Sequence, residues 1–380
     1  MRLVSGDVAV ARIPRLLGIS ILTGKEVAIS EDDFRLLSRL PSDQWSELDA
    51  FEPAARSRIA KLAQDGLVVS SEDDPLLNEL RQRDQDLAAA PWNIYGALFH
   101  ALTSWRDVDL RRDFGDPTEL PLQADEAVAA FVDRHGPPPS HFHRIDGAER
   151  AVELPLERRD EGVFAALRRR KTVRGFDRTA AVTLHELATI LYEVFGCHGL
   201  VEIGAGVTAL KKTSPSGGSL HPIEAYVLIR NVDRIAPGVY HYRAEDHALE
   251  PLELLSADEV EELTAEFVCG QTYFANAGAV FVLVARFRRT FWKYRKHLRA
   301  YGVLLLDAGH LSQTLYLVCA ELGLGAFVTA AINGGNIGER LGLGEFTEGA
   351  LAVCGCGRPA HGPSPLEPEF VPYQPRQRGE

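Results

Sequence analysis

Apolar and polar positions divide the chain into a C-terminal part, in which strands alternate with helices, and an N-terminal part that is mostly helical. Residues 225–229, 239–242 and 279–287 are short, mainly apolar runs rich in Val, Leu and aromatic residues, a pattern typical of buried strands. Residues 350–356 repeat the pattern and predict the last strand. Strands separated by helical segments indicate an α+β or α/β fold.

Two helices of the C-terminal part have clear boundaries. Thr183 and Glu186 have the spacing of a capping box, and apolar residues at helical spacing follow until Gly196. The second helix covers about residues 303–322, ends at Gly323 and is apolar on most of its faces. We expect such a helix to be buried on all sides, in the centre of a domain or in a subunit interface.

The N-terminal part predicts helices of a different kind. Ser30 and the three acidic residues after it have the pattern of a helix N-terminus, and a second helix ends at Gly66, before the strand-like residues 67–70. This order of elements, two helices followed by a glycine and a strand, is typical of a winged helix. Two interpretations of this region remain open: a small peptide-binding winged helix, or short helical scaffolding.

Residues 85–112 predict a further helix, whose apolar stripe is more typical of core than of a cofactor site. The stripe consists of Trp92, Tyr95, Leu98, Phe99 and Leu102. In the proline-rich connector that follows, His141 and His143 have no third ligand nearby in the sequence, so we predict no metal site. The predicted units are a winged-helix-like region (1–80), a helical segment with the connector (81–153), the main domain (154–361) and an extended tail (362–380).

Composition narrows the possible partners and the location. The formal net charge of −12 argues against nucleic-acid binding, which requires a basic surface. The five cysteines show no CxxC spacing, which favours buried free thiols in a reducing compartment. The first residues do not resemble a signal peptide, and no apolar run reaches the roughly 18 residues of a membrane span. We therefore expect a cytoplasmic protein that has neither a nucleic-acid nor a membrane partner.

A cluster of positive charge stands out in this acidic chain at "LRRRKTVRGFD", residues 167–177. It contains five cations within seven positions: Arg168, Arg169, Arg170, Lys171 and Arg174. Charge runs are usually solvated helix ends. However, guanidinium groups also match phosphate oxygens bidentately, so the segment is a candidate site for an anionic cofactor or substrate.

The stretch "KKTSPSGGSLHPIEAYVLIR", residues 211–230, places small residues directly before a strand. Gly217 and Gly218 have no Cβ, so their backbone N–H groups can approach a flat ligand closely. Pro215 fixes the approach of the chain, Ser216 adds a donor, and two lysines supply positive charge. The alternative is a simple tight turn, although a turn alone does not require so many small residues in a row.

Polar residues interrupt the long apolar helix. Asp307, His310 and Thr314 share one of its faces, and an Asp and a His inside an apolar helix are costly unless they are paired or line a cavity. A structural Asp–His pair and a functional cavity are therefore both open. Lys293 and Tyr294 lie together among aromatic residues before this helix, and "LGLGAFVTA", residues 322–330, adds closely spaced glycines before a strand-like run.

Taken in order, these stretches resemble the flavin-dependent nitroreductase superfamily, and more narrowly its SagB/ThcOx branch of peptide-maturation dehydrogenases. The resemblance runs from about Phe164 to Pro359 and rests on "RKTVRGF", "SPSGGSLHPIEAYV", "GVYHY", "DAGHLSQTLYL" and "ELGLGAF". It implies an α+β fold with a central antiparallel or mixed sheet flanked by helices. It also implies a homodimer formed through long helices, with one FMN at each subunit boundary.

The resemblance also implies a set of cofactor-binding residues. The FMN phosphate and ribityl chain are expected at Arg170, Lys171, Thr172, Arg174 and Arg358. The isoalloxazine ring is expected at Pro215, Ser216, Gly217 and Gly218, with Ser216 reaching the flavin of the neighbouring subunit. Backbone groups of Gly325 and Ala326 lie near the ring, and Gln313 adds a polar contact.

In this branch a Lys–Tyr pair takes part in the oxidation of azolines to azoles, and Lys293 and Tyr294 match it. The resemblance therefore implies that the flavin N5 accepts a hydride from carbon, and we expect Lys293 to be the base with Tyr294 as its partner. The implied substrate is a ribosomal precursor peptide of leader plus core, with a cyclodehydratase or other maturation enzymes as further partners. Two alternatives remain: a reductase of dehydroamino acids, nitro compounds or quinones that uses NAD(P)H, and a non-catalytic scaffold of a peptide-modifying complex.

Overall fold

A six-stranded sheet forms the centre of the computed structural model. The model describes residues 16–42, 44–110, 112, 129–130, 132–134, 136–142, 152, 154–155 and 159–362. The strands are β5 (Ile223–Ile229), β6 (Gly238–Arg243), β7 (Ala248–Leu254), β8 (Ala279–Arg286), β9 (Gly325–Thr329) and β10 (Glu348–Gly357). Their order in the sheet is β7-β6-β5-β8-β10-β9, and each neighbouring pair is antiparallel. This arrangement confirms the predicted α+β class.

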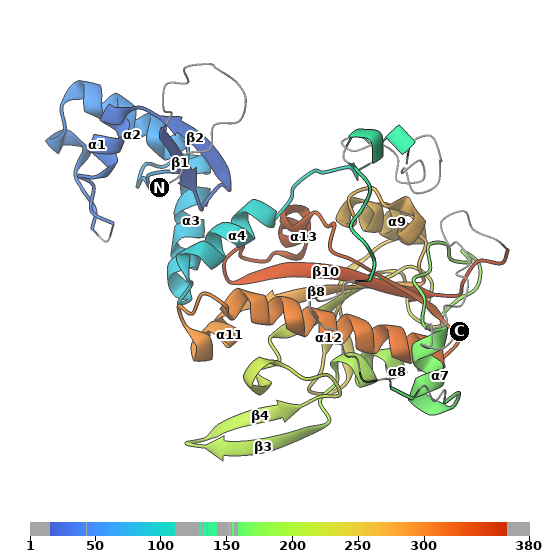
Figure 1. The fold of residues 1–380 in the computed structure, drawn as a ribbon. Helices are drawn as coiled ribbons and strands as arrows, with labels where there is room; N and C mark the ends of the chain where they lie inside the picture. Colours follow the sequence, from blue (N-terminus) through green and yellow to red (C-terminus); the bar gives the residue numbers. More distant parts are fainter. Residues whose placement is uncertain are drawn as a thin grey trace.

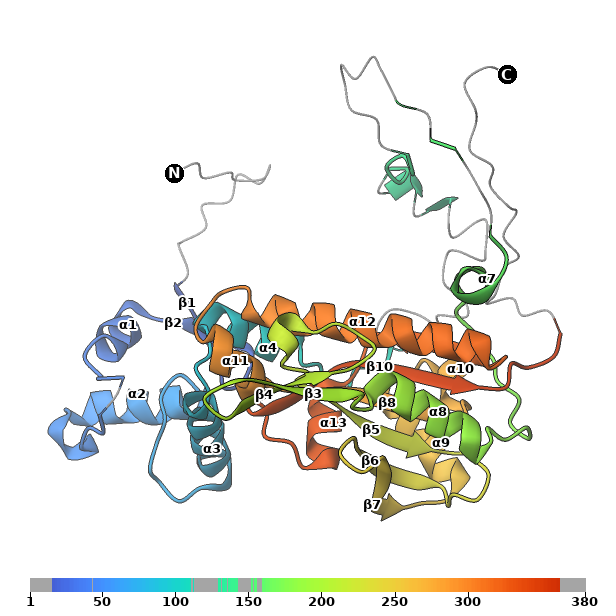
Figure 2. The ribbon, with the colours of Figure 1, turned by 90° about the horizontal axis from the view of Figure 1, so that it is seen from below.

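Helices cover both faces of this sheet (Figures 1 and 2). One face carries α8 (Leu184–Phe195) and α12 (Ala300–Glu321), and the other carries α9 (Ala257–Phe267), α10 (Thr272–Ala275) and α13 (Gly334–Leu341). The sheet therefore lies between two helical layers.

The central strand β8 shows why its sequence is apolar without alternation. Phe281 and Leu283 belong to the core cluster that contains α8 and α12, whereas Val280 and Val282 belong to the cluster that contains α9. Successive side chains of a strand point to opposite faces, so a strand covered on both sides needs an apolar residue at each position.

The predicted boundaries of α8 and α12 are confirmed. The Thr183 hydroxyl accepts a hydrogen bond from the Glu186 amide, which completes the capping box, and α12 is followed by Gly323 with φ +70°. By length and composition alone α12 could cross a membrane, but it packs on α8, β9 and β10. It is not buried on all sides of this chain, because Leu305 and Leu306 are 43% and 64% exposed.

The N-terminal region forms a separate lobe of small strands and helices (Figure 1). Its elements are β1 (Leu16–Ser20), β2 (Lys25–Ile29), α1 (Glu31–Leu37), the short 3₁₀-helix Leu48–Ala50 and α2 (Pro53–Gln64). The Ser30 cap is confirmed as a capping box with Asp33. The prediction of a strand at 67–70 is wrong: Leu67 packs on Gly18 of the hairpin, and the two strands that pair here precede the helices.

The single helix predicted over residues 85–112 is also wrong, because two helices occupy this region. They are α3 (Pro75–Ala89) and α4 (Ile94–Thr103). Pro91 explains the break, since the residue before a proline is pushed out of the helical conformation, and Ala90 is extended. Only part of the predicted stripe is core: Trp92 is buried, whereas Tyr95 and Phe99 are 68% and 50% exposed.

Four further elements complete the part of the chain that surrounds the candidate site. They are α7 (Gly162–Arg169), the hairpin β3 (Gly199–Gly204) and β4 (Val207–Lys211), and α11 (Phe287–Tyr294). His143 and residues 363–380, which include most of the predicted tail, lie outside the described residues.

Candidate active site

The glycine loop before β5 is held on α12 by the polar residues that interrupt that helix. Ser214 and Thr314 share a hydrogen bond of 2.6 Å between their hydroxyl oxygens. His310 Nδ1 lies 3.1 Å from the carbonyl oxygen of Pro215. The alternative of a structural Asp–His pair is wrong, because each residue binds the loop separately.

Asp307 makes the closest contacts with the loop. Its carboxylate accepts hydrogen bonds from the Ser216 hydroxyl at 2.6 Å and from the Gly217 amide at 3.0 Å. The Ser216 oxygen in turn accepts from the His221 amide at 3.0 Å. Asp307 is only 4% exposed to solvent. The hydrogen bonds from the loop therefore replace the water that its two carboxylate oxygens would otherwise bind.

The surroundings of Gly217 and Gly218 leave no room for a side chain at either position. A Cβ on Gly217 would lie 2.2 Å from Val303 Cγ1, so any side chain would collide with α12. Gly218 has φ +66°, and a Cβ there would lie 2.8 Å from Lys293 Nζ and 3.0 Å from the Tyr294 hydroxyl. The smallness of the loop therefore lets it fit between two helices.

The predicted catalytic pair is thus next to the predicted ring-binding loop. Lys293 and Tyr294 end α11, and the Lys293 ammonium lies 5.9 Å from the centre of the Tyr294 ring. The helix is anchored by Phe287 and Phe291, whose buried rings pack against Trp92. A buried aromatic cluster therefore fixes the base of α11 and positions its polar end at the loop.

The cationic segment divides into an outer and an inner part. Arg168 and Arg169 form ion pairs on the surface, with Asp160 at 2.5 Å and Glu321 at 2.7 Å. This is the solvated helix end that charge runs usually form. Arg170 instead lies over the ring of Tyr316 on α12, with its guanidinium carbon 5.2 Å from the ring centre.

The inner part joins the edge of the sheet. Thr172 pairs with Ala326 of β9 in a parallel bridge, and the Val173 amide donates to the Ala326 carbonyl at 2.9 Å. The Thr172 hydroxyl lies 2.8 Å from the Tyr316 hydroxyl. Packing explains why residue 325 is a glycine, because a Cβ at this position would lie only 2.8 Å from Val173 Cγ2.

The remaining residues of the predicted cofactor site lie on α12, directly after β10 and in the cationic segment. Gln313 is exposed on α12. Arg358 forms an ion pair with Glu186, Nη2 lying 2.7 Å from each carboxylate oxygen. Burial pushes the pKa of Glu186 upwards, but hydrogen bonds from Thr183 and Arg358 outweigh it, and the net pKa is below the ordinary value. Lys171 and Arg174 lie in the same segment as Thr172 and have interactions of their own.

Both ends of the candidate site are carried by α12. Asp307 holds the glycine loop and Tyr316 contacts the cationic segment, and nine residues of helix separate them by about 14 Å. One end offers small backbone groups beside Lys293, and the other offers cations with the Thr172 hydroxyl. This donor set fits a cofactor with a flat ring and a phosphate, such as FMN.

Two residues of this site were not recognised in the sequence, and a third contacts a different group from the one expected. Tyr316 is an aromatic residue in an apolar helix and gives no local signal of its contact with Thr172. His221 has φ +44°, and its Nε2 lies 3.1 Å from the Leu210 carbonyl. Lys212 was expected to supply charge to the loop, but its ammonium donates to the Phe195 carbonyl at the end of α8, and burial lowers its pKa.

Over the described ranges, no three His, Cys, Asp or Glu side chains are placed together to hold a metal ion. The five cysteines are free thiols, and burial raises the pKa of Cys269 to about 12. A thiol with so high a pKa is a poor nucleophile.

The fold and the site define an α+β protein in which one helix, α12, connects a cationic segment with a glycine loop that lies beside a Lys–Tyr pair. Residues 167–358, half of the chain, match the nitroreductase family. The chain belongs to this family of flavin oxidoreductases, which confirms the resemblance seen in the sequence.

Relatives within the family include peptide-processing proteins. The chain is 33% identical over 145 residues to the trifolitoxin-processing protein TfxB of Rhizobium leguminosarum bv. trifolii, covering 38% of this chain and 39% of TfxB. It is 29% identical over 158 residues to the microcin B17-processing protein McbC of Escherichia coli, covering 38% of this chain and 53% of McbC. The matches therefore span about half or less of these two relatives.

A solved structure extends the likeness of fold beyond the family match. A chain of the E. coli microcin synthetase McbBCD complex, with truncated pro-MccB17 bound, superposes with a TM-score of 0.51 at 19% identity. The superposition covers 77% of this chain and 100% of that chain. At this identity the comparison concerns the fold alone, and it confirms the nitroreductase-like architecture.

Proposed function

We propose that this protein is an FMN-dependent dehydrogenase that oxidises azoline rings to azoles in a ribosomally synthesised peptide. The observation that carries the proposal is the position of Lys293 and Tyr294, whose polar ends lie against Gly218 of the predicted ring-binding loop. The relatives named as peptide-processing proteins support a peptide as the substrate.

The chain's own residues would hold FMN at two ends. Arg170, Lys171, Thr172 and Arg174 would bind the phosphate through charge-assisted hydrogen bonds. The loop from Pro215 to Gly218, fixed on α12 by Asp307, would present its backbone to the ring of an FMN bound at the subunit boundary. When bound, FMN supplies an acceptor for a hydride.

The Lys–Tyr pair provides the acid–base part of the reaction. An azoline becomes an azole by losing a hydride from one ring carbon and a proton from the adjacent one. In its neutral form, the Lys293 amine accepts that proton, and the Tyr294 hydroxyl beside it hydrogen-bonds the substrate or passes the proton on. Lys293 makes no ion pair with the described residues, so its amine is available to substrate.

The exposed apolar face of the core helices supports a homodimer. Tyr95, Phe99 and Leu102 on α4 and Leu305 and Leu306 on α12 are all exposed large apolar side chains. Residues of this kind gathered on neighbouring helices mark an interaction site. We infer that two chains associate through these helices, and sedimentation of the purified protein tests it.

The N-terminal lobe is the proposed site for the leader of the precursor peptide. Leu16, Leu17 and Ile19 of the hairpin and Phe34 of α1 are exposed, and among the described residues no third strand pairs with the outer edges of this hairpin. An extended peptide can add to such an edge as a further strand. A cyclodehydratase that forms the azoline is the proposed partner enzyme, and the cytoplasm is the proposed location.

The test begins with the purified protein. We expect it to be yellow and to release FMN rather than FAD, and to convert a synthetic thiazoline peptide to a product two hydrogens lighter, with oxygen as the final electron acceptor. A product two hydrogens heavier in the presence of NADPH would show a reductase instead. Absence of flavin after reconstitution would show a non-catalytic scaffold.

A further inference from the structure

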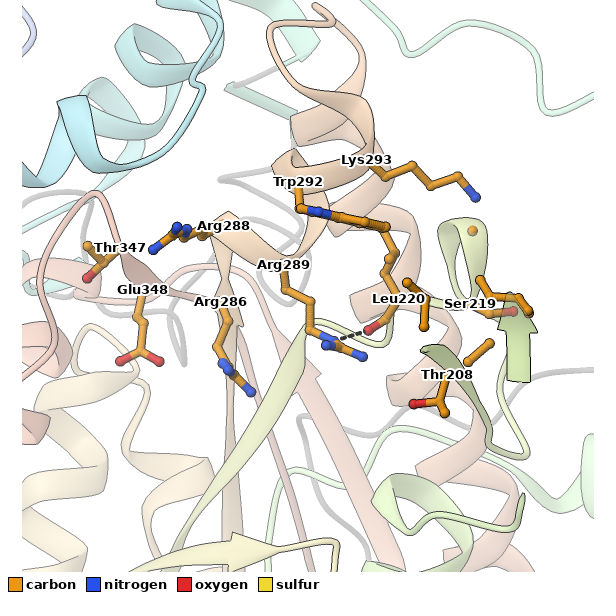
Figure 3. Close-up of a pocket in the computed structure, with 14 residues that line it drawn as sticks. Thr208, Ser219, Leu220, Arg286, Arg288, Arg289, Trp292, Lys293, Thr347 and Glu348 are labelled. Carbon is orange, nitrogen blue, oxygen red and sulfur yellow. Dashed lines mark hydrogen bonds between the residues drawn. The ribbon is translucent and has the colours of Figure 1, made fainter. Parts of the chain in front are cut away.

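A cavity of about 670 Å³ opens beside the Lys–Tyr pair, between the β3–β4 hairpin and α11. Figure 3 shows Arg288, Thr347 and Glu348 towards one end of it, and Lys293 and Ser219 towards the other. The residues that line it come from the hairpin, the end of the glycine loop, β8, α11 and the start of β10. It is therefore continuous with the candidate active site, because Gly218 and Lys293 belong to both.

The charged side chains of the cavity are mostly basic, although the chain as a whole is acidic. Among the lining residues that the structure describes, four are cations and Glu348 is the single carboxylate; the cations are Arg286, Arg288, Arg289 and Lys293. In a chain of net charge −12, such a cluster makes a local positive potential that favours an anionic ligand.

Two of these arginines already have internal partners. Arg286 forms an ion pair with Glu224 at 3.1 Å, and Arg289 donates to the Leu220 carbonyl (Figure 3). Burial lowers the pKa of Arg289, and the neighbouring Arg286 adds to the effect. Within the described residues, Arg288 has neither an ion pair nor a side-chain hydrogen bond, and it is exposed. Its guanidinium is the group available to a ligand.

The cavity also has an apolar wall. Trp292 is 54% exposed at its rim, and Leu220, Ile203 and Val207 line it. The hairpin continues this surface with Leu200 and Val201, which are exposed. An apolar wall of this extent suits side chains and backbone of a peptide, because a small inorganic anion has no apolar part to bury.

We propose that this cavity binds the stretch of substrate peptide that flanks the residue being modified, and that it prefers stretches containing Asp or Glu, with Arg288 as the main contact. The inference rests on the proposed function, since it names the substrate class of the same site. A carboxylate on the peptide forms a bidentate pair with the Arg288 fork, and the flanking apolar side chains lie on Trp292 and the hairpin.

The experiment uses the FMN-loaded protein and two synthetic thiazoline peptides. The peptides are identical except for two aspartates or two asparagines close to the ring. Calorimetric titration at low salt should show about tenfold tighter binding of the aspartate peptide, and the difference should shrink as salt screens the charges. Arg288→Glu should remove the preference.

Arg234→Glu is the matched control, because Arg234 is an exposed arginine outside the cavity and without a side-chain hydrogen bond or ion pair to the described residues. It changes the net charge by the same amount and should keep the preference. Equal binding of the two peptides, or a preference that survives Arg288→Glu, overturns the proposal. If Arg288→Glu weakens NADPH binding and leaves peptide binding unchanged, the cavity binds a nucleotide and the proposal is also wrong.

The same peptides separate this inference from the proposed function. If the aspartate peptide binds preferentially through Arg288 but neither peptide loses two hydrogens, the function fails and the cavity assignment stands. If both peptides are oxidised with equal efficiency and bind equally, the function stands and the assignment fails.

Discussion

The Ser216 hydroxyl donates a hydrogen bond of 2.6 Å to Asp307, and the same carboxylate accepts from the Gly217 amide at 3.0 Å. This contact joins a loop to the middle of a helix 90 residues away in the sequence. It explains why an apolar core helix carries an aspartate: the buried charge is satisfied by the loop that it orients. The loop that is proposed to face the cofactor therefore depends on α12 for its shape.

Replacing Asp307 should release this loop. Asp307→Ala leaves the Ser216 hydroxyl and the Gly217 amide without their acceptor, and we expect the free energy of unfolding to fall by about 2–4 kcal/mol, together with weaker FMN retention. Urea unfolding and FMN fluorescence measure the two effects. Asp307→Asn keeps an acceptor for Gly217 and should lose less. An Asp307→Ala protein with unchanged stability and FMN affinity would show that the contact has no orienting role.

The fit of Gly217 against α12 can be tested by a rescue. Gly217→Ala places a methyl group where Val303 Cγ1 lies, so we expect a loss of about 1–3 kcal/mol in stability. Val303→Ala removes the colliding methyl groups, and the double variant should recover most of the loss. A thermodynamic cycle over the four proteins measures the coupling. Additive effects would mean that Gly217 is needed for another reason, such as close approach of a ligand.

The sequence predicts this fold best where one physical requirement acts on consecutive residues. The apolar run of β8, the N-cap of α1, the capping box of α8 and the length of α12 were all predicted, because burial and capping leave local patterns. The hairpin β3–β4 was not predicted. Its strands are mostly exposed and lack a buried face, so no alternation marks them.

The errors have equally local causes. The helix predicted over residues 85–112 ignored Pro91, which ends α3, and it assigned Tyr95 and Phe99 to the core although the small residues Gly96 and Ala97 are the buried ones. In the candidate site, the glycine loop and the cationic segment were singled out in the sequence, but the partners of Asp307 were not. A single sequence does not show which loop a buried carboxylate contacts when the two are 90 residues apart.

Substitutions at Thr172 and at its partner Tyr316 should weaken FMN binding to different extents. Thr172→Ala removes a hydroxyl proposed to bind the phosphate and also breaks its contact with Tyr316, so FMN should bind about tenfold more weakly. Tyr316→Phe keeps the ring beneath Arg170 and should lose less. Thr189→Ala on the exposed side of α8 is the control and should bind FMN normally. Equal affinities for Thr172→Ala and the control would remove Thr172 from the phosphate site.

The Lys–Tyr pair should control turnover without controlling cofactor binding. Lys293→Ala removes the proposed base, and we expect the rate of azoline oxidation to fall by about 100-fold or more while FMN content stays normal. Tyr294→Phe should cause a smaller loss. Lys296→Ala, an exposed lysine just beyond α11, should leave the rate unchanged. Normal turnover by a flavin-loaded Lys293→Ala protein would exclude the role proposed for this lysine.

His100 makes the attachment of α4 to the core sensitive to acid. The residue is 3% exposed. Its Nδ1 lies 3.1 Å from the Tyr301 hydroxyl, and its Nε2 lies 2.9 Å from the Glu345 carbonyl. Burial lowers the pKa of His100 from 6.5 to about 4. Below pH 6.5 the unfolded chain therefore takes up a proton that the folded chain does not, and stability is lost as the pH falls towards 4.

The size of this effect can be isolated with one substitution. The lowered pKa of His100 corresponds to about 3 kcal/mol of stability lost between pH 6.5 and about 4. His100→Gln removes the titrating group, so this variant is less stable at neutral pH but should lose less stability on acidification than the unmodified protein. Urea unfolding at a series of pH values measures the slope. His185→Gln, at an exposed position on α8, should leave the slope unchanged. The same slope in His100→Gln and the unmodified protein would place the acid sensitivity elsewhere in the fold.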